Sequence, residues 1–344
     1  MMTQRYEQYL ALKAADPKQY ARDLAAQMGI SEAELVMARC GHDARALKAE
    51  VRPLLTALSA VGETKSITRN EYAVHEIIGR YENLHLGDHA GLVLNPRALD
   101  LRLFPGQWHS AFALREATAH GERQSIQFFD KQGDAILKVY ATDCTDLNAW
   151  LALVDRFEDE TLSQLAVEPP EVIQWEKQPD TLAIEHEWRA MTDVHQFFGL
   201  LKRHNISRQQ AFRAVASDLA YRVNNQALAQ ILRMAKQDGN EIMIFVGNRG
   251  CTQIFTGIIE KLQPMQSWLN VFNPGFTLHL REDQIAESWV TRKPTDNGLV
   301  TSLELFAADG TQIAQLFGQR TEGQAEQNRW REQLATLSET GEAA

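Results

Sequence analysis

An internal repeat constrains the fold of this chain more than any single motif does. The segment SIQFFDKQGDAILKVYA at 125–141 aligns without a gap on SLELFAADGTQIAQLFG at 302–318, an offset of 177 residues. The same offset places Arg115 on Arg292. A match of this length at one fixed spacing indicates two copies of one folding unit, so the fold of one half predicts the fold of the other.

The repeat divides the 344 residues into two halves of ordinary domain length. We expect an N-terminal repeat at 1–163, a linker at 164–180 and a C-terminal repeat at 181–344. The linker contains the Pro169-Pro170 pair, and its sequence matches neither repeat. Proline-rich segments of this kind typically connect folded units instead of belonging to them.

The patterning of each half predicts helices first and strands afterwards. The run at 194–201 has apolar residues at helical spacing, with Thr192 or Asp193 as the N-cap. Ser207 is followed three residues later by Gln210, which is the spacing of a capping box. Seven short strands and a closing helix follow, and the first half repeats this order. Consecutive strands without intervening helices predict an α+β fold in which each half contains a large antiparallel sheet.

The charge balance limits the class of partner. Lys and Arg total 35 and Asp and Glu total 45, so the formal net charge is −10. A chain this acidic is not expected to bind nucleic acid, although a local group of basic residues could still hold one small anion. The N-terminus resembles no signal peptide and no window has 18 uninterrupted apolar residues, so we expect a cytoplasmic protein without membrane insertion.

His195 is a candidate ligand because the repeat does not share it. If 195–200 is aligned with 7–12, its counterpart is Glu7. Phe198 and Gly199 follow three and four residues later, on the same side of the predicted helix. A glycine within a helix costs about 1 kcal/mol relative to alanine, and its lack of a side chain would let a flat ligand approach. The alternative is a surface histidine with an incidental glycine.

Two further features favour an apolar anion as the ligand. In the strand predicted at 98–104, alternation places Arg102 and Phe104 on one face, which pairs a permanent cation with an aromatic wall. Arg208 and Arg320 lie at a helix start and a strand end, where cations could pair with carboxylates at the mouth of a pocket. The alternative in both cases is an ordinary solvated surface.

Other chemistry lacks its sequence signatures. The chain contains no P-loop, dinucleotide-binding, nucleophile-elbow or zinc-protease motif. Its three cysteines are far apart and form no CxxC pair, which gives no support for a zinc or iron–sulfur site. The run Glu185-His186-Glu187 contains metal-ligating residue types, but adjacent side chains point in different directions.

Four long segments of the sequence resemble a known family. They are MTDVHQFFGLLKRHNISRQQAF at 191–212, NEIMIFVGNRGCTQIFTG at 240–257, WVTRKPT at 289–295 and LFAADGTQIAQLFGQRTEG at 305–323. These segments resemble the HemS/ChuS/HmuS family of cytoplasmic haemin transport and degrading proteins, and the likeness extends over essentially the whole chain.

The resemblance implies that the chain binds haem b between a helix of the C-terminal half and the N-terminal half. It implies that His195 is the proximal iron ligand, that Arg102 is the distal residue facing the iron, and that His75 is a possible second haem contact. Phe317 stands where the family has tyrosine. The remaining implied residues form the pocket wall and the propionate rim: Phe104, Phe245 and Phe317 for the wall, and Arg208, Lys293, Gln315 and Arg320 for the rim.

Two functions from different classes are compatible with such a pocket. The first is a haem-binding protein of haem uptake and iron acquisition, which traffics haem after import. The second is a haem-degrading, oxygenase-like enzyme that releases iron and takes electrons from an external reductant, since no flavin or nicotinamide motif is present. The expected partners are haem, a haem importer on its cytoplasmic side, an acceptor protein and an electron donor, with the chain as a monomer or homodimer.

Overall fold

The computed structural model describes residues 2–321 and 323–337, with only the backbone of residues 2 and 3. The chain divides into two compact units, and each unit includes a short segment from the opposite half of the sequence. Unit 1 contains the residues up to Arg69, His75–Glu171 and Gly247–Gln253; unit 2 contains Asn70–Val74, Val172–Val246 and the residues from Ile254 onward.

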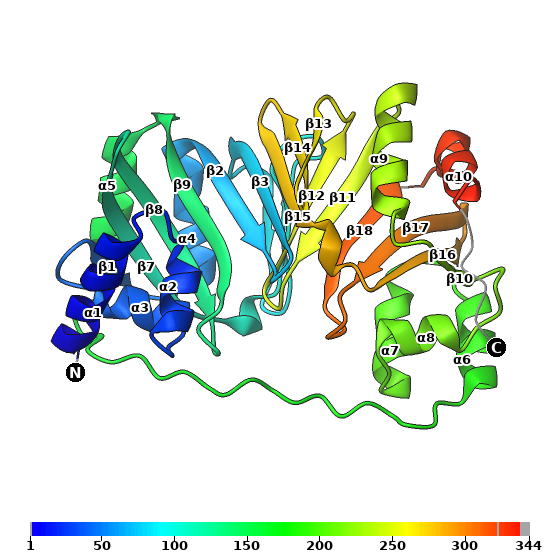
Figure 1. Ribbon diagram of the computed structural model, residues 1–344, viewed down its shortest axis with the longest axis horizontal. Coiled ribbons are helices and arrows are strands. Elements are labelled where there is room, and N and C mark those ends of the chain that lie inside the picture. Colours follow the sequence, from blue (N-terminus) through cyan, green and yellow to red (C-terminus); the bar gives the residue numbers. More distant parts are fainter. Residues whose placement is uncertain (1, 322, 338–344) are drawn as a thin grey trace. The chain divides into compact units, whose positions relative to one another are not determined.

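The first half of the sequence begins with helices, continues with strands and ends with a helix (Figure 1). Its helices are α1 (Met2–Ala15), α2 (Ala21–Gln27), α3 (Glu32–Ala38), α4 (Val51–Leu58) and α5 (Leu147–Phe157), with 3₁₀ turns η1 (Ser59–Val61) and η2 (Pro105–Gln107). Its strands are β1 (Ala44–Leu47), β2 (Gly62–Arg69), β3 (Ala73–Arg80), β4 (Leu84–Leu86), β5 (Gly91–Leu94), β6 (Asp100–Leu103), β7 (Trp108–Thr118), β8 (Gly121–Asp130) and β9 (Ala135–Thr145).

The second half repeats this order of elements. Its helices are α6 (Thr181–Arg189), α7 (Gln196–His204), α8 (Arg208–Arg213), α9 (Ala227–Asp238) and α10 (Asn328–Ala335), with the 3₁₀ turn η3 (Glu282–Gln284). Its strands are β10 (Ala220–Val223), β11 (Ile242–Gly247), β12 (Cys251–Gly257), β13 (Leu262–Met265), β14 (Trp268–Asn273), β15 (Phe276–Arg281), β16 (Glu287–Thr295), β17 (Gly298–Phe306) and β18 (Gln312–Gly318).

The two halves correspond element by element, apart from η1. Three helices, one strand, one helix, eight strands and a closing helix occur in each half in the same order. This order corrects one sequence alignment. The helix α7, which follows His195, occupies the place of α2 and not that of α1, so Glu7 is not the counterpart of His195.

The strands form two nine-stranded sheets. Within unit 1, strands β1, β7, β8, β9 and β2 are neighbours in that order, and within unit 2 the corresponding strands β10, β16, β17, β18 and β11 follow the same order. The pairs along both runs are antiparallel. The predicted α+β class, with large antiparallel sheets and a closing helix in each half, is therefore confirmed.

The helices α6, α7 and α8 are held on their sheet by an aromatic core. Trp188 of α6 and Phe197 of α7 are buried together with Phe212 of α8, and the three pack with Trp289 and Phe306 from the strands. The Trp188 and Phe197 ring centres are 4.6 Å apart. Because buried aromatic side chains contribute large apolar areas, this core fixes the start of α7 relative to the sheet.

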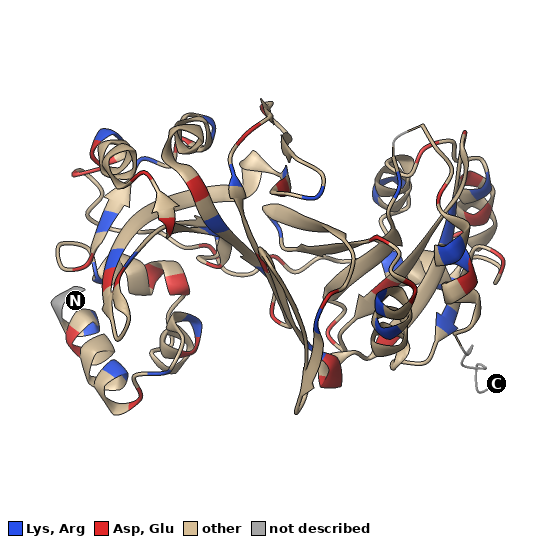
Figure 2. Cartoon of the chain, turned by 90° about the horizontal axis from the view of Figure 1, so that it is seen from above, with Lys and Arg blue, Asp and Glu red and all other residues tan. Residues whose placement is uncertain are grey.

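Residues 159–180 form no helix or strand. Among the described residues, no helix is long and apolar enough to cross a membrane. Basic and acidic residues are interspersed along the helices and strands of each unit (Figure 2).

Candidate functional site

His195 lies at the N-cap of α7, with its side chain 90% exposed. The sequence pattern predicted that the helix would already include Val194, with Thr192 or Asp193 as the cap. The α-helix starts two residues later, at Gln196, because the preceding residues form a tighter turn. In this turn the Gln196 and Phe197 N–H groups donate to carbonyls three residues back, at 3.2 Å each. The Asp193 carboxylate accepts a hydrogen bond from the His195 N–H at 2.7 Å. His195 is therefore held in a turn at the open end of the helix.

The same carboxylate contacts the imidazole ring. Asp193 Oδ1 lies 2.7 Å from His195 Nδ1. Hydrogen bonds from the backbone and then the side chain of His195 lower the pKa of Asp193, and the nearby charge of Arg320 lowers it further. An ionised carboxylate only accepts hydrogen bonds, so Nδ1 carries the proton in this pair. The lone pair of the neutral ring is then on Nε2, the nitrogen that can bind a metal.

The helix surface after His195 is open. The Phe198 side chain is 74% exposed. A Cβ atom at Gly199 would meet only the end of the Arg203 side chain, at 3.0 Å. Since a flexible guanidinium can move aside, packing within the chain does not require glycine here. An exposed phenyl ring and a helix side without a side chain therefore lie one turn from the imidazole.

A buried carboxylate organises the cations of unit 2. Glu304 of β17 is 0% exposed, and Arg208 binds it through two hydrogen bonds, from Nε at 2.8 Å and Nη2 at 2.9 Å. Lys293 of β16 donates from Nζ to Glu304 Oε1 at 3.0 Å. Two formal positive charges surround one negative charge, so the cluster retains a net positive charge when all three groups are ionised.

Neutral donors complete the environment of this carboxylate. The Ser302 hydroxyl donates to it at 3.0 Å and the Gln312 amide at 2.8 Å. The Gln315 amide and the Thr291 hydroxyl lie at 3.4 Å. Burial of a charge requires this density of partners, because each unsatisfied polar group in a core costs about 1–3 kcal/mol. The sequence predicted Arg208, Lys293 and Gln315 as rim residues but did not identify Glu304, which joins them.

The aromatic core lies directly beside the cations. Lys293 Nζ is 4.7 Å from the ring centre of Phe197, and the Arg208 guanidinium is 5.0 Å from the same ring. Cations at these distances from an aromatic face are stabilised by the ring quadrupole. Phe197 is the second residue of α7, so the cluster contacts the turn that carries His195.

The electrostatics of the cluster follow from burial and pairing. Burial alone would raise the pKa of Glu304, but Arg208 and Lys293 outweigh burial and hold this pKa well below the usual 4.5. Burial lowers the pKa of Lys293 to about 8, with a smaller contribution from Arg208 in the same direction and opposition from Glu304. At neutral pH the carboxylate is therefore ionised and the amine is mostly protonated.

Strand register places the predicted aromatic residues beside this cluster. Phe245 of β11 is opposite Gln315 of β18, and Gln315 is opposite Glu304 of β17. Phe317 lies two residues further along β18 and therefore shares the face of Gln315. The Phe245 and Phe317 ring centres are 5.1 Å apart, in an edge-to-face arrangement. Both side chains are half-buried.

The predicted rim residue Arg320 lies in unit 2 and is half-buried, and three further predicted residues lie in unit 1. Arg102 of β6 is half-buried; it pairs with Asp100 and donates to the Leu101 carbonyl at 3.2 Å. Phe104 is 41% exposed, and its N–H donates to the Gly250 carbonyl at 3.0 Å. His75 of β3 is 0% exposed.

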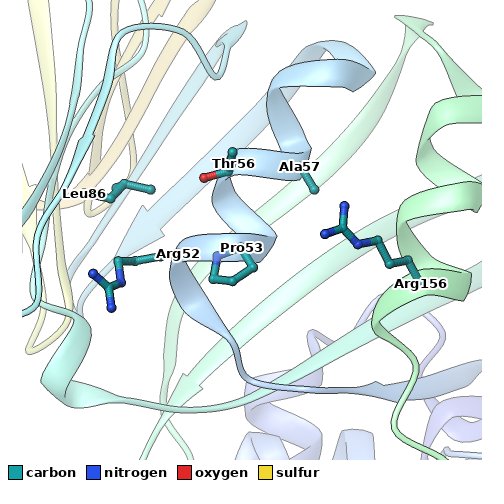
Figure 3. A pocket seen from close by; sticks show the side chains of 6 residues that line it. All are labelled: Arg52, Pro53, Thr56, Ala57, Leu86 and Arg156. Carbon is teal, nitrogen blue, oxygen red and sulfur yellow. The ribbon is translucent and has the colours of Figure 1, made fainter.

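Metal clusters and hollows elsewhere in the described residues do not mark the predicted site. Among these residues, no group of three or more His, Cys, Asp or Glu side chains is arranged to hold a metal ion. An open hollow of about 620 Å³ in unit 1 is lined by residues of α4, β4 and α5 (Figure 3). Its lining contains none of the residues predicted from sequence: Arg52, Pro53, Thr56, Ala57, Leu86 and Arg156.

Comparison with known proteins identifies one family. The model of the haemin-degrading HemS/ChuX domain matches residues 29–157 and again residues 205–337. The chain is 65% identical over 335 residues to the hemin transport protein HmuS of Yersinia pestis, covering 96% of each sequence. It is 64% identical over 342 residues to the hemin transport protein HemS of Yersinia enterocolitica, covering 98% of this chain and 99% of that one.

Two solved structures agree with this match. The heme-degrading enzyme ChuS of Escherichia coli O157:H7 superposes with a TM-score of 0.94 at 62% identity, covering 98% of this chain and 99% of that one. The heme-bound form of PhuS, a heme-binding protein of Pseudomonas aeruginosa, superposes with a TM-score of 0.96 at 40% identity, covering 99% and 100%. The family match to both halves agrees with the internal duplication predicted from the repeat.

Proposed function

The chain belongs to the haemin-degrading HemS/ChuX domain family, and from this we propose that it binds haem and traffics it in haem uptake and iron acquisition. The observation that carries the proposal is His195, an exposed imidazole at an open helix end whose Nδ1 is engaged by a carboxylate. Haem supplies an iron that takes a nitrogen ligand, an apolar ring and two carboxylates. Unit 2 offers a chemically suitable group for each of these.

We assign the proximal iron ligand to His195. Its Nε2 is the free ligand atom, and the open surface at Gly199 leaves space for a flat ring. The half-buried Phe245 and Phe317 provide apolar contact for the macrocycle. Phe317 contributes this contact without the hydroxyl of the family's tyrosine.

The propionates would pair with the basic side of the site. Arg208, Gln315 and Arg320 are the proposed partners, since each has polar hydrogens and is partly exposed. Lys293 is buried against Glu304, so its proposed contribution is the positive potential that it adds behind Arg208. An arginine is well suited to this role because its planar group binds a carboxylate through two hydrogen bonds.

The proposal also includes three residues of unit 1. Arg102 is the proposed distal residue; it has no lone pair, so it can donate hydrogen bonds but cannot act as a strong ligand. Phe104, with an exposed ring, is a proposed wall residue. His75 is a possible second haem contact, although it is fully buried and would need a local opening of unit 1 to reach haem.

Haem degradation is the second candidate function. It is supported by the 62% identity to ChuS, which is described as a heme-degrading enzyme. In this reaction the same residues would bind and orient the haem, and electrons would come from an external reductant. In either function the expected setting is the cytoplasm, with an importer, an acceptor and an electron donor as partners and a monomeric or homodimeric chain.

The test adds haemin to the purified protein and follows the Soret band, then adds a reductant together with an iron chelator and catalase. Stoichiometric uptake of haemin would support the binding proposal. Loss of the Soret band with iron release in the presence of catalase would add the enzymatic function, whereas a stable band would exclude it. Absence of any haemin-dependent Soret band would refute the proposal.

His195→Ala tests the ligand assignment. We expect an altered ferric spectrum and weaker haemin binding, with His204→Ala at the other end of α7 as the matched control. An unchanged spectrum in the His195 variant would refute the assignment. Arg102→Ala should change the distal environment or the degradation rate more than it changes affinity.

A further inference from the structure

The two nitrogens of the His195 ring have different surroundings. Nδ1 lies 2.7 Å from the Asp193 carboxylate. Nε2 makes no hydrogen bond to any residue that the structure describes. The imidazole side chain is 90% exposed, so Nε2 faces solvent while Nδ1 contacts Asp193. The pair thus has the arrangement of a ligand and its supporting carboxylate.

Asp193 is itself fixed in position. Its Oδ1 also accepts from the His195 N–H at 2.7 Å, which closes a short turn between the two residues. The Gln196 side chain ties down the backbone on the other side by accepting from the Thr192 N–H at 2.9 Å. The Asp193 carboxylate is therefore held beside the imidazole by its bonds to the ring and to the His195 N–H. The bond between Gln196 and Thr192 restrains the backbone of the same turn.

Helix capping accounts for only one of the two hydrogen bonds of this carboxylate. An aspartate that caps a helix accepts from backbone N–H groups two or three residues beyond the cap position. Asp193 lies two residues before the N-cap, and both of its hydrogen bonds in this turn go to His195 itself. The bond from the His195 N–H is of the kind that caps a helical turn, whereas the contact with Nδ1 is made to the ring in addition to it.

We propose that Asp193 is a positioning residue for His195, fixing the Nδ1–H tautomer and the ring orientation so that Nε2 is presented to haem iron. This inference rests on the proposed function. Carboxylates that accept from the second nitrogen of a metal-bound histidine orient the ring and raise the basicity of the ligand atom. Asp193 also contributes a negative charge that strengthens electron donation from the imidazole to the iron.

The experiment compares Asp193→Asn, which keeps the size but removes the charge, with Asp193→Glu, which keeps the charge. Glu187→Gln is the matched control, because Glu187 contacts Nε2 of His204 at 2.8 Å and this pair lies at the opposite end of α7. The first readout is the His195 tautomer in the haem-free protein, from ¹⁵N NMR. The second is the iron–histidine stretching frequency of the reduced, haemin-loaded protein, from resonance Raman spectroscopy.

We expect the Nδ1–H tautomer in the wild type and a mixture of tautomers in Asp193→Asn. We expect a lower iron–histidine stretching frequency in Asp193→Asn and a return to the wild-type frequency in Asp193→Glu. As a third measurement, Asp193→Asn should lose haem to apomyoglobin about tenfold faster than the wild type, the lower end of the effects measured for such supporting residues. The Glu187→Gln control should match the wild type in all three measurements.

An Asp193→Asn variant with wild-type tautomer and stretching frequency would overturn the inference, even if its stability changed. Failure of the proposed function has a different signature, since a wild type that takes up no haemin would yield no iron–histidine band. In that outcome the iron-directed role would fall with the function, whatever tautomer the haem-free protein shows.

Discussion

Glu304 is the residue with which two cations of unit 2 form ion pairs. Its carboxylate is fully buried and binds both Arg208 and Lys293. Removing one partner of a buried ion pair leaves the others without compensation for their lost hydration, which is more costly than losing a surface contact. The stability of this region should therefore depend strongly on one side chain.

We predict that Glu304→Gln lowers the free energy of unfolding by about 3 kcal/mol, the lower end for breaking a buried ion pair. Urea denaturation followed by tryptophan fluorescence measures this loss. Glu187→Gln is the control, because Glu187 is partly exposed, with Arg203 and His204 as partners, and ion pairs that solvent reaches contribute about 1 kcal/mol or less. Equal effects of the two substitutions would contradict the central role of Glu304.

The same carboxylate predicts a pH dependence. The pKa of Glu304 is held below the value of 4.5 that it has in the unfolded chain, so ionisation stabilises the fold at any pH above 4.5. As the pH falls below 4.5, the unfolded chain takes up a proton that the folded one still resists, and this stabilisation is progressively lost. The stability difference between wild type and Glu304→Gln should shrink as the pH falls below about 4.5. A constant difference down to about pH 3 would contradict it.

Sequence alone predicted the cations of this group but not their partner. Arg208 and Lys293 were assigned through family resemblance. Glu304 had a visible signal, since it is an acidic residue in the apolar run LVTSLELF at 299–306, but its burial depends on three strands and a helix meeting there. Period-two alternation shows which residues share a face and does not show what covers that face.

At the scale of elements, a capping box places Arg208. The Ser207 hydroxyl oxygen accepts from the Gln210 N–H at 3.2 Å, and the Gln210 side-chain oxygen accepts from the Ser207 N–H at 2.9 Å. Arg208 is consequently the first residue of α8. The sequence predicted this helix start from the serine–glutamine spacing, and the structure confirms it.

We predict that Ser207→Ala lowers stability by about 1 kcal/mol, a typical cost of losing an N-cap, and also weakens haemin binding because Arg208 loses its anchor. Ser31→Ala is a matched control supplied by the duplication, since Ser31 caps α3 in unit 1 through the same type of box. Thermal melts and haemin titrations should show similar destabilisation for both variants but weaker binding only for Ser207→Ala. Equal haemin affinities in the two variants would contradict the anchoring role.

The start of α7 shows the limit of local rules. Thr192 and Asp193 are both good N-cap residues by composition. The chain instead closes a tight turn, in which the Gln196 N–H donates to the Asp193 carbonyl three residues back, and the α-helix begins only at Gln196. Such 3₁₀-type turns are frequent at helix starts, and residue type alone does not decide where α-helical bonding begins.

At the scale of the molecule, the duplicated halves carry different charges at equivalent positions. The first residue of α8 is Arg208, whereas the first residue of α3 is Glu32. The 177-residue offset places Gln127 at the position of Glu304 and Lys138 at that of Gln315. In unit 1, Lys138 pairs with Glu32. The acid of this layer therefore comes from the sheet in unit 2, as Glu304, and from the helix in unit 1, as Glu32.

From this difference we predict one tightly bound haem per chain. A haemin titration followed at the Soret band should reach its endpoint at one equivalent, and His75→Ala should leave that endpoint unchanged. The physical reason is that α3 begins with the acid Glu32 where α8 begins with Arg208, and an acid repels the propionates that Arg208 would bind. An endpoint at two equivalents that returns to one in His75→Ala would contradict this prediction.

The sequence by itself determined the duplication, the α+β class and the family, because all three depend on long patterns that local chemistry preserves. It also predicted His195 as a candidate ligand, since a reactive side chain close to a glycine is visible in the sequence. Only the tertiary structure decided which charged groups pair with one another. The pairing of Arg208 and Lys293 with Glu304 depends on burial and on distances of about 3 Å between elements that the linear order leaves open. The pairing of Asp193 with the imidazole depends on the conformation of the turn that contains both residues.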